Sequence, residues 1–423
     1  MSKIDTLFDF INSSPTAYHA VSSIADRLTS CGYTEICEKD TAAFSDGGKH
    51  FVRRNGSSII AFSGRAEQSF IITAAHSDFP SFKVKSCQGG TYARVTTERY
   101  GSMILYSWLD RPLSIAGRAV VRRGEALEII PVNFDRDMLV IPSVAIHQNR
   151  TVNEGYALNP AVDMLPLYTA GQERFDITEL LAAELSVDAA DIVSHDLFVY
   201  NRECARLLDG GLILSPRLDD LECVSACLDA FLEATPADGA VNVLAVFDNE
   251  EVGSSTKQGA NSSFLDMTLR RIAGSDERYY SMLPDSFMVS ADNAHAKHPN
   301  HPELSDSVSA PILGEGVAVK YNANQSYATD AVSDAIFRTA ASRAGAKVQS
   351  FSTRADKPSG STLGSIANTK VSISTVDVGL PQLAMHSSTE TAATADYLGF
   401  VDIVKELYSS RICRTESSIE IIK

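Results

Sequence analysis

Residues 241–254 read VNVLAVFDNEEVGS. The apolar run over 241–247 has the length and composition of a strand that is buried on both faces of a sheet. Two adjacent glutamates, Glu250 and Glu251, follow this run and precede a turn at Val252-Gly253-Ser254. Two carboxylates at the end of a buried strand are costly unless a cation compensates them. We therefore expect Glu251 to bind a metal ion and Glu250 to exchange protons with substrate and water.

The chain on either side of this stretch repeats the pattern. SFIITAA (69–75) leads into His76, and SFMVSA (286–291) leads into Asp292. From residue 211 onwards, such runs alternate with amphipathic helical patterns, which predicts an α/β fold with a mostly parallel sheet and flanking helices. Because ligands bind at the carboxyl ends of the strands in such sheets, we expect His76, Glu251 and Asp292 to lie close together.

Residues 88–210 have a different texture. Short β-rich pieces, among them TYARVTTE, GRAVVRR and LEIIPVNF, are separated by glycine and polar breaks, and no long helical pattern occurs before 176–185. This texture predicts an inserted, mostly β module over 88–210, which interrupts an α/β domain formed by 1–87 and 211–423.

Five residues of metal-binding type stand in separate contexts along the chain: His76, Asp219, Glu251, Asp292 and His386. Two imidazoles and three carboxylates can hold two divalent ions about 3.5–4 Å apart, with one carboxylate bridging them. Three carboxylates and one bridging hydroxide neutralise two such cations. The thiolate-free shell suits zinc, and also manganese or cobalt. The set predicts a hydrolase that splits an amide with a metal-activated water, with Glu250 as its base.

Taken alone, several of these residues have ordinary structural interpretations. Asp219 and Asp220 stand where a helical pattern begins, and the helix dipole favours acids there. His386 fits a core histidine, and His76 fits a buried histidine with a satisfied hydrogen bond. The set of five, rather than any one member, therefore carries the prediction of a metal site.

Two further residues are candidates for supporting roles. Asp78 stands two residues after His76, where its carboxylate can fix the tautomer of a metal-binding imidazole. His295 belongs to a histidine-rich stretch after Asp292, and it is a candidate for binding substrate. The histidine spacing in that stretch is by itself a weak zinc pattern.

Composition narrows the class of protein. A formal charge of −16 argues against nucleic acid and against an anionic membrane surface as partners. The 7 cysteines are scattered and contain no CxxC pair, which favours reduced thiols and a cytoplasmic setting. The first twenty residues do not have the pattern of a signal peptide, and we expect no membrane span.

The ordered motifs of this chain resemble the aspartyl aminopeptidase family of co-catalytic zinc aminopeptidases. The matching stretches cover nearly the whole chain: AAHSDFPSFKVK (74–85), YGSMILYSWLDRPLSIAGR (100–118), IPSVAIHQNRTVNEG (141–155), SPRLDDL (215–221), DNEEVGSSTKQGA (248–260), DNAHAKHPN (292–300), VKYNANQSYAT (319–329), GSTLG (360–364) and DVGLPQLAMHS (377–387). The resemblance implies a metallopeptidase α/β domain that is split by a β-rich dimerisation domain.

Site roles follow from the resemblance motif by motif. It implies that two zinc ions are bound, with Asp219 as the bridging ligand, by His76, Asp219, Glu251, Asp292 and His386. It also implies that Glu250 is the general base and acid and that Asp78 orients His76. His147 is implied to reach the active site of a neighbouring subunit, and Lys320 to contact the acidic side chain of the substrate.

Relatives in this family remove single N-terminal residues, and many prefer Asp or Glu. They assemble from dimers into large closed particles, commonly dodecamers, which implies self-association of this chain through 88–210. Two departures from the family pattern bear on these expectations. Asp220 stands where relatives usually have Asn, and Ser388-Thr389 replaces an Ile-Arg pair that many relatives carry after their histidine.

The leading hypothesis is therefore a cytoplasmic metal-dependent aminopeptidase with a preference for acidic N-termini. One alternative keeps this chemistry with neutral or broad specificity. A second alternative is a related binuclear metal amidohydrolase that acts on N-acyl amino acids or another small amide. A third, from a different class, is a catalytically idle assembly or cargo protein; the presence of Glu250 and all five candidate ligands argues against it.

Overall fold

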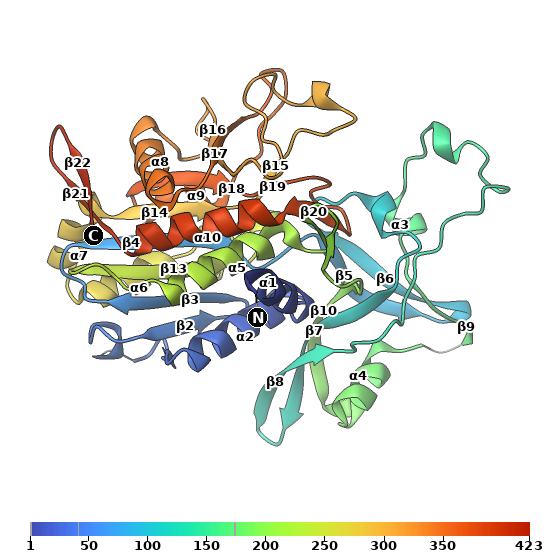
Figure 1. Cartoon of the computed structure of the whole chain (residues 1–423). Coiled ribbons are helices and arrows are strands. Elements are labelled where there is room, and N and C mark those ends of the chain that lie inside the picture. Colours follow the sequence, from blue (N-terminus) through green and yellow to red (C-terminus); the bar gives the residue numbers. More distant parts are fainter. Residues whose placement is uncertain (1, 41, 173–174) are drawn as a thin grey trace. The chain divides into compact units, whose positions relative to one another are not determined.

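The computed structural model describes residues 2–40, 42–172 and 175–423 (Figure 1). Its contacts divide the chain into two compact units. The larger unit consists of Met1–Asp78, Ala205–Met385 and Glu390–Lys423, and the smaller unit of Phe79–Cys204 and His386–Thr389. The expected boundaries at 88 and 210 remain a prediction about domains, because compactness does not test independent folding.

The larger unit is built around a nine-stranded sheet, as traced in the described residues. Its strands, in spatial order, are β1 (Thr34–Glu35), β2 (His50–Arg54), β3 (Ser58–Gly64), β13 (Ala240–Phe247), β4 (Ser69–His76), β14 (Phe287–Ala291), β18 (Ser374–Gly379), β16 (Val317–Tyr321) and β17 (Val348–Ser352). The central neighbours β13, β4, β14 and β18 run parallel, whereas β3 and β16 run antiparallel to the strands inside them. The expected α/β fold with a large central sheet is confirmed.

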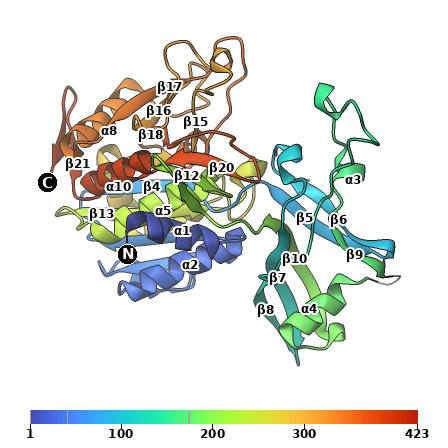
Figure 2. The ribbon, with the colours of Figure 1, turned by 45° about the vertical axis from the view of Figure 1, so that its right-hand side comes forward.

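Helices cover both faces of this sheet (Figures 1 and 2). Apolar side chains of α6 (Phe264–Ala273), α7 (Asp276–Met282) and α9 (Leu363–Asn368) share one core with alternate residues of the central strands. On the other face, α2 (Ala17–Ser30), α5 (Leu218–Glu233) and α10 (Thr394–Tyr408) contact β3, β13 and β4. The strands β4 and β13 are buried along their whole length because both faces are covered.

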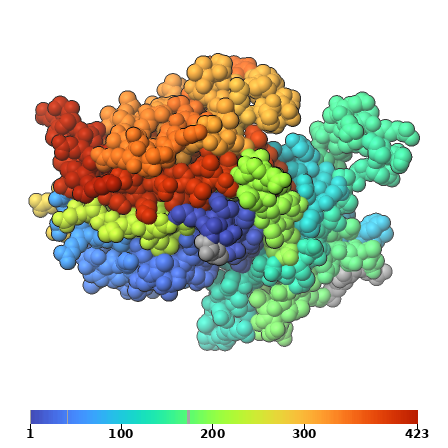
Figure 3. Space-filling view, viewed as in Figure 1, coloured from blue at the N-terminus to red at the C-terminus, as the bar shows by residue number. Residues whose placement is uncertain are grey.

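Two more helices complete the larger unit. The helix α1 (Lys3–Asn12) begins with a capping box formed by Ser2 and Asp5, and it packs on α5. The helix α8 (Ala331–Ala344) runs from the cap Asp330 to Gly345, whose positive φ ends it, and it lies beside α10 on the face that Figure 3 shows.

Short strands finish the larger unit at its margins. They form a three-stranded sheet of β11 (Arg206–Leu208), β12 (Leu212–Ser215) and β20 (Glu390–Ala393), and the pairs β15 (Ala294–His295) with β19 (Pro381–Gln382) and β21 (Arg411–Arg414) with β22 (Ile419–Ile422). Within the described residues, no helix combines the length and apolar composition that crossing a membrane requires.

The smaller unit is a six-stranded antiparallel sheet with its own apolar core. Its strands, in spatial order, are β8 (Ala126–Asn133), β7 (Leu113–Arg123), β10 (Ile192–Asn201), β5 (Ser81–Gln88), β6 (Gly90–Tyr100) and β9 (Leu167–Gln172). The helix α4 (Ile177–Leu185) packs Ile177 and Leu181 into this core, and α3 (Pro160–Asp163) lies in the long connection from β8 to β9.

Candidate metal centre

Three parallel strands bring candidate ligands to one edge of the large sheet. The strand β4 ends at His76, which is paired in register with Phe247, the last residue of β13. On the other side of β4, Ser290 of β14 is paired with Ala74, so Asp292 follows at the level of His76. Glu250 and Glu251 begin a short 3-10 helix, η5 (Glu250–Val252), just beyond β13. The register of parallel strands thus explains why residues far apart in sequence meet here.

His76 is held in a fixed orientation. Its side chain is 1% exposed, and its Nε2 lies 3.4 Å from Asp219 Oδ1. Its Nδ1, when protonated, donates a hydrogen bond to the backbone carbonyl of Asp78 at 3.0 Å, and it lies 3.5 Å from the Asp78 carboxylate. This arrangement leaves Nε2 as the nitrogen that faces the Asp219 carboxylate and that could bind a cation.

Asp78 also holds the glutamate pair. Its Oδ1 accepts a hydrogen bond from the Glu250 N–H at 3.0 Å, and its Oδ2 accepts one from the Glu251 N–H at 3.2 Å. The carboxylate of Asp78 therefore fixes the start of η5, and the backbone carbonyl of Asp78 orients His76. The sequence reasoning linked Asp78 to His76 alone and did not foresee its contact with the glutamates.

Asp219 and Asp220 lie where the chain enters α5, but their backbone is not helical. Asp219 has φ −79° and ψ 106°, and its N–H donates to Glu390 Oε2 at 3.1 Å. Asp220 Oδ2 accepts the His76 N–H at 3.1 Å. These two carboxylates therefore do not cap a regular helix; they turn toward the strand end that carries His76.

The ligand atoms of these residues form one tight group. His76, Asp219, Asp220 and Asp292 each offer an atom that lies within 4.8 Å of the others, and all four are buried. Carboxylate oxygens of Asp219 and Glu251 also lie within 4.8 Å of each other. Asp220 was not among the expected ligands, although the acidic pair in SPRLDDL was its sequence signal.

The donor set fits the metal ions that the sequence predicted. Imidazole and carboxylate donors suit zinc, manganese or cobalt. A buried carboxylate oxygen, Asp220 Oδ1, accepts no hydrogen bond from the part of the chain that the structure describes, as expected for a site built to receive a cation. The residues present therefore fit a metal cofactor.

The pKa values of His76 and Glu250 also indicate a site that suits a cation. Burial lowers the pKa of His76, but the carboxylates of Asp220, Asp219 and Asp78 outweigh burial and raise that pKa well above its usual value. Burial raises the pKa of Glu250 to about 8, and the carboxylates of Asp292, Asp78 and Asp219 add to this increase against the opposing effect of His76. Both shifts reflect a negative electrostatic potential at this edge, which a bound cation would balance.

Lys320 on β16 is a buried cation beside this group. Its side chain is 4% exposed, and its Nζ lies 3.6 Å from Asp292 Oδ1 and 5.6 Å from the centre of the Tyr327 ring. Burial lowers the pKa of Lys320, but Asp292, Tyr327 and Asp377 together outweigh burial, so the pKa of Lys320 is raised above its usual value. Asp377 accepts hydrogen bonds from Thr362 Oγ1 at 2.7 Å and from the Ala328 N–H at 2.5 Å.

The remaining expected residues are His295, His147 and His386. His295 is exposed and lies edge-on to Phe351, with 6.1 Å between ring centres. His147 is exposed in the smaller unit. His386 directly follows Met385 of the larger unit but clusters with the smaller one, where its carbonyl accepts the Ile104 N–H at 3.0 Å. The place of the His386 side chain among the ligands is therefore part of the proposal below.

Ser388 and Thr389, which depart from the family pattern, both form hydrogen bonds in the structure. Ser388 lies in the smaller unit, where its N–H donates to Ser107 Oγ at 2.9 Å, and Thr389 Oγ1 donates to Glu203 Oε2 at 3.0 Å. Both residues thus contribute hydrogen bonds within that unit. Glu390, the next residue along the chain, was not foreseen as a functional residue, yet it holds the N–H of Asp219.

Known proteins resemble this chain over nearly its full length. A family model described as aminopeptidase I zinc metalloprotease (M18) matches residues 10–408. A probable M18 family aminopeptidase 2 of Clostridium acetobutylicum is 41% identical over 423 residues, covering 95% of this chain and 98% of the relative. Its counterpart in Pseudomonas putida strain GB-1 is 38% identical over 420 residues, covering 96% and 97%.

Solved structures agree with the sequence comparison. The structure described as the cryo-EM structure of the Ape4 and Nbr1 complex matches with a TM-score of 0.91 and 32% identity, over 96% of this chain and 85% of that chain. The resemblance read from the motifs is thereby confirmed. The chain belongs to the M18 family of zinc metalloprotease aminopeptidases.

Proposed function

We propose that this protein removes single N-terminal residues from peptides, with a preference for Asp or Glu. The proposed ligands of two zinc ions are His76, Asp219, Glu251, Asp292 and His386, with Asp219 bridging. The observation that carries the proposal is the buried group of His76, Asp219 and Asp292 at the strand ends, beside which Asp78 holds the backbone N–H of Glu250. Membership of the M18 family supports the metal-dependent aminopeptidase activity itself.

Glu250 is the proposed general base and acid. When bound, the metal ions would polarise the scissile carbonyl and lower the pKa of the attacking water. The Glu250 carboxylate would take a proton from that water and deliver it to the leaving amine nitrogen. Its backbone N–H is anchored on Asp78, and Asn249 before it has a positive φ of 65°, so the side chain leaves a fixed turn.

Lys320 is the proposed anchor for an acidic side chain. Its ammonium group is buried beside a small apolar cluster of Ala294, Ala318, Tyr327 and Phe351. A substrate carboxylate brought next to such a desolvated cation gains a charge-assisted hydrogen bond. His295 carries its exposed imidazole at the margin of the same cluster, where we propose that it contacts the substrate.

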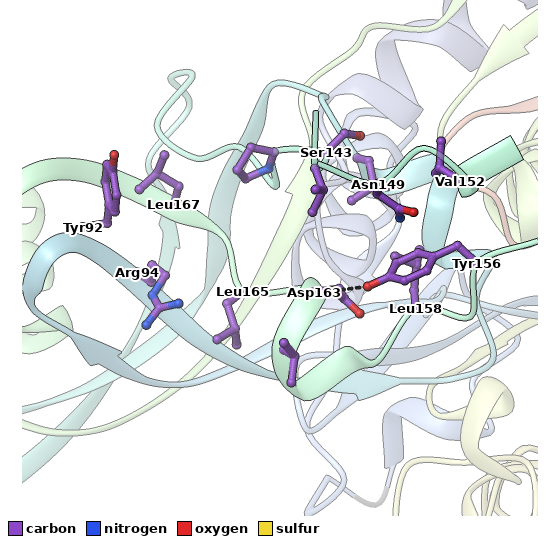
Figure 4. A pocket seen from close by; sticks show the side chains of 14 residues that line it. Tyr92, Arg94, Ser143, Asn149, Val152, Tyr156, Leu158, Asp163, Leu165 and Leu167 are labelled. Atoms are coloured by element: carbon purple, nitrogen blue, oxygen red, sulfur yellow. Dashed lines mark hydrogen bonds between the residues drawn. The ribbon is translucent and has the colours of Figure 1, made fainter. Parts of the chain in front are cut away.

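Self-association is proposed to proceed through the smaller unit, to dimers and then a dodecamer. The segment between β8 and β9 exposes Val144 at 50%, Ile146 at 49% and Tyr156 at 47%, and this segment also carries His147. Together with β6 and β9 it lines an open, largely apolar pocket of about 550 Å³, in which Tyr156 is hydrogen-bonded to Asp163 (Figure 4). Exposed apolar surface of this kind favours a protein partner, and we propose that His147 reaches the active site of the adjoining subunit.

The proposed activity is tested with dipeptides that carry free or acetylated N-termini and begin with Asp, Glu, Leu or Lys, each with and without a chelator. We expect cleavage of free Asp and Glu termini that the chelator abolishes and zinc restores. Cleavage led by Leu or Lys would favour neutral or broad specificity. Cleavage restricted to acetylated substrates would favour a related amidohydrolase, and no cleavage with metal restored would favour an idle assembly protein.

Glu250→Gln is expected to lower kcat by at least about 100-fold, because general acid–base catalysis contributes about 10²–10⁴-fold and the amide cannot exchange the proton. Zinc content, measured by elemental analysis, should stay at the wild-type value because the ligands are intact. Substantial activity in a zinc-loaded Glu250→Gln protein would contradict the role assigned to this residue.

Lys320→Met keeps most of the side-chain volume but removes the charge. Because a hydrogen bond to a charged group contributes about 1.5–3 kcal/mol, kcat/KM for Asp and Glu substrates should fall by about 10–100-fold. The fall for a Leu substrate should be smaller, since that side chain does not need the cation. Equal losses on acidic and neutral substrates, at unchanged zinc content, would exclude Lys320 as the specificity residue.

Val144→Asp combined with Ile146→Asp places charges on the proposed contact segment. We expect the particle mass, measured by light scattering after gel filtration, to fall below that of the wild-type protein. The matched control is Val308→Asp in the larger unit, because Val308 is 89% exposed. A wild-type monomer, or an equal fall in mass for the control, would refute assembly through the smaller unit.

A further inference from the structure

Asp220 is the buried acidic residue at the metal centre to which the proposed mechanism gives no task. Its side chain is 0% exposed. One carboxylate oxygen, Oδ2, accepts the backbone N–H of His76 at 3.1 Å. The other oxygen, Oδ1, is buried and accepts no hydrogen bond from residues 2–40, 42–172 or 175–423. A carboxylate oxygen left in this condition is unfavourable unless a cation is meant to lie near it.

The surroundings of Asp220 indicate where that cation belongs. One Asp220 oxygen lies within 4.8 Å of ligand atoms from His76, Asp219 and Asp292. Two of these three neighbours are themselves acidic, so the site packs three carboxyl groups with one imidazole. Lys320 approaches Asp292, at 3.6 Å, on the β16 side of the group.

We propose that Asp220 is a functional part of the metal site, where its negative charge strengthens metal binding and destabilises the metal-free protein. This inference rests on the metal site of the proposed function but adds a residue to it. Asp220 would act on the metal through charge, while its hydrogen bond to the His76 N–H fixes the end of β4. Asp220 thus positions His76 through its hydrogen bond and strengthens metal binding through its charge.

The negative charge of Asp220 has opposite effects on the two states: it destabilises the metal-free protein and stabilises the metal-bound protein. Without metal, Asp220 is repelled by Asp219 and Asp292 and is separated from water. With a divalent cation in the group, the same carboxylate is attracted to it, and the repulsion between the acids is compensated. A purely structural residue would instead stabilise the metal-free and metal-bound protein alike.

Asp220→Asn separates the charge from the hydrogen bond. The amide oxygen of the variant can still accept the His76 N–H, while the negative charge is lost. We expect the metal-free Asp220→Asn protein to have a higher Tm than the metal-free wild type. We also expect its zinc affinity, measured by titration against a competing chelator, to be about tenfold weaker or more.

Glu222→Gln is the matched control. Glu222 lies on the same helix and is also 0% exposed. Its Oε2 accepts a hydrogen bond from Asn293 Nδ2 at 3.1 Å, and its Oε1, like Asp220 Oδ1, accepts none from the described residues. Glu222 differs from Asp220 in that it is not part of the ligand group. Its substitution should change zinc affinity by less than about threefold. A loss as large as that of Asp220→Asn would show a general effect of buried charge and would overturn the assignment.

Asp220→Ser is a second neutral variant, which keeps the test decisive if Asp220→Asn folds poorly. We expect its zinc affinity also to be weaker than that of the wild type. Unchanged zinc affinity in both variants would overturn the proposal, as would a fall in Tm of equal size with and without zinc. These results are distinguishable from failure of the proposed function, because in that case the wild-type protein itself would neither bind zinc nor cleave peptides.

Discussion

The structure depends on one electrostatic constraint, which is that several carboxylates are buried at the carboxyl ends of β4, β13 and β14. Parallel strands in register bring His76, Glu251 and Asp292 to a single edge, and α5 adds Asp219 and Asp220. Such a group is unfavourable in an apolar interior unless a cation balances it. The buried strands therefore provide the rigid frame. A bound cation would stabilise the acidic side chains at its edge.

Asp78 connects the proposed general base with the proposed metal ligands. Its backbone carbonyl orients His76, and its carboxylate accepts the N–H groups of Glu250 and Glu251. These hydrogen bonds fix the proposed base relative to the proposed ligands. The rigidity of the centre thus comes from backbone donors and acceptors as much as from the ligands.

Much of the frame was predictable because its determinants are local. Buried strands such as β4 and β13 appear as continuous apolar runs, and the histidine or acid that follows each run marks the sheet edge. The contacts within the centre were not predictable in the same way. Glu250 meets Asp78 across 172 positions and Asp219 meets Glu390 across 171, and no local pattern encodes such pairs. The proposed role of Asp220 also depends on an oxygen that accepts no hydrogen bond within the described residues, which a sequence cannot reveal.

The proposed substrate anchor Lys320 shares a partner, Asp292, with the proposed metal site. In the metal-free protein its ammonium group lies near Asp292, one of the proposed ligands, whereas Asp377 already accepts bonds from Thr362 and Ala328. A cation bound to Asp292 would compete with Lys320 for the negative charge of that carboxylate and leave the buried ammonium group beside Tyr327 less compensated. An acidic substrate side chain would then compensate the charge, whereas a neutral one would leave it unbalanced. On this assignment, the preference for acidic termini is a consequence of metal occupancy rather than a separate feature of the pocket.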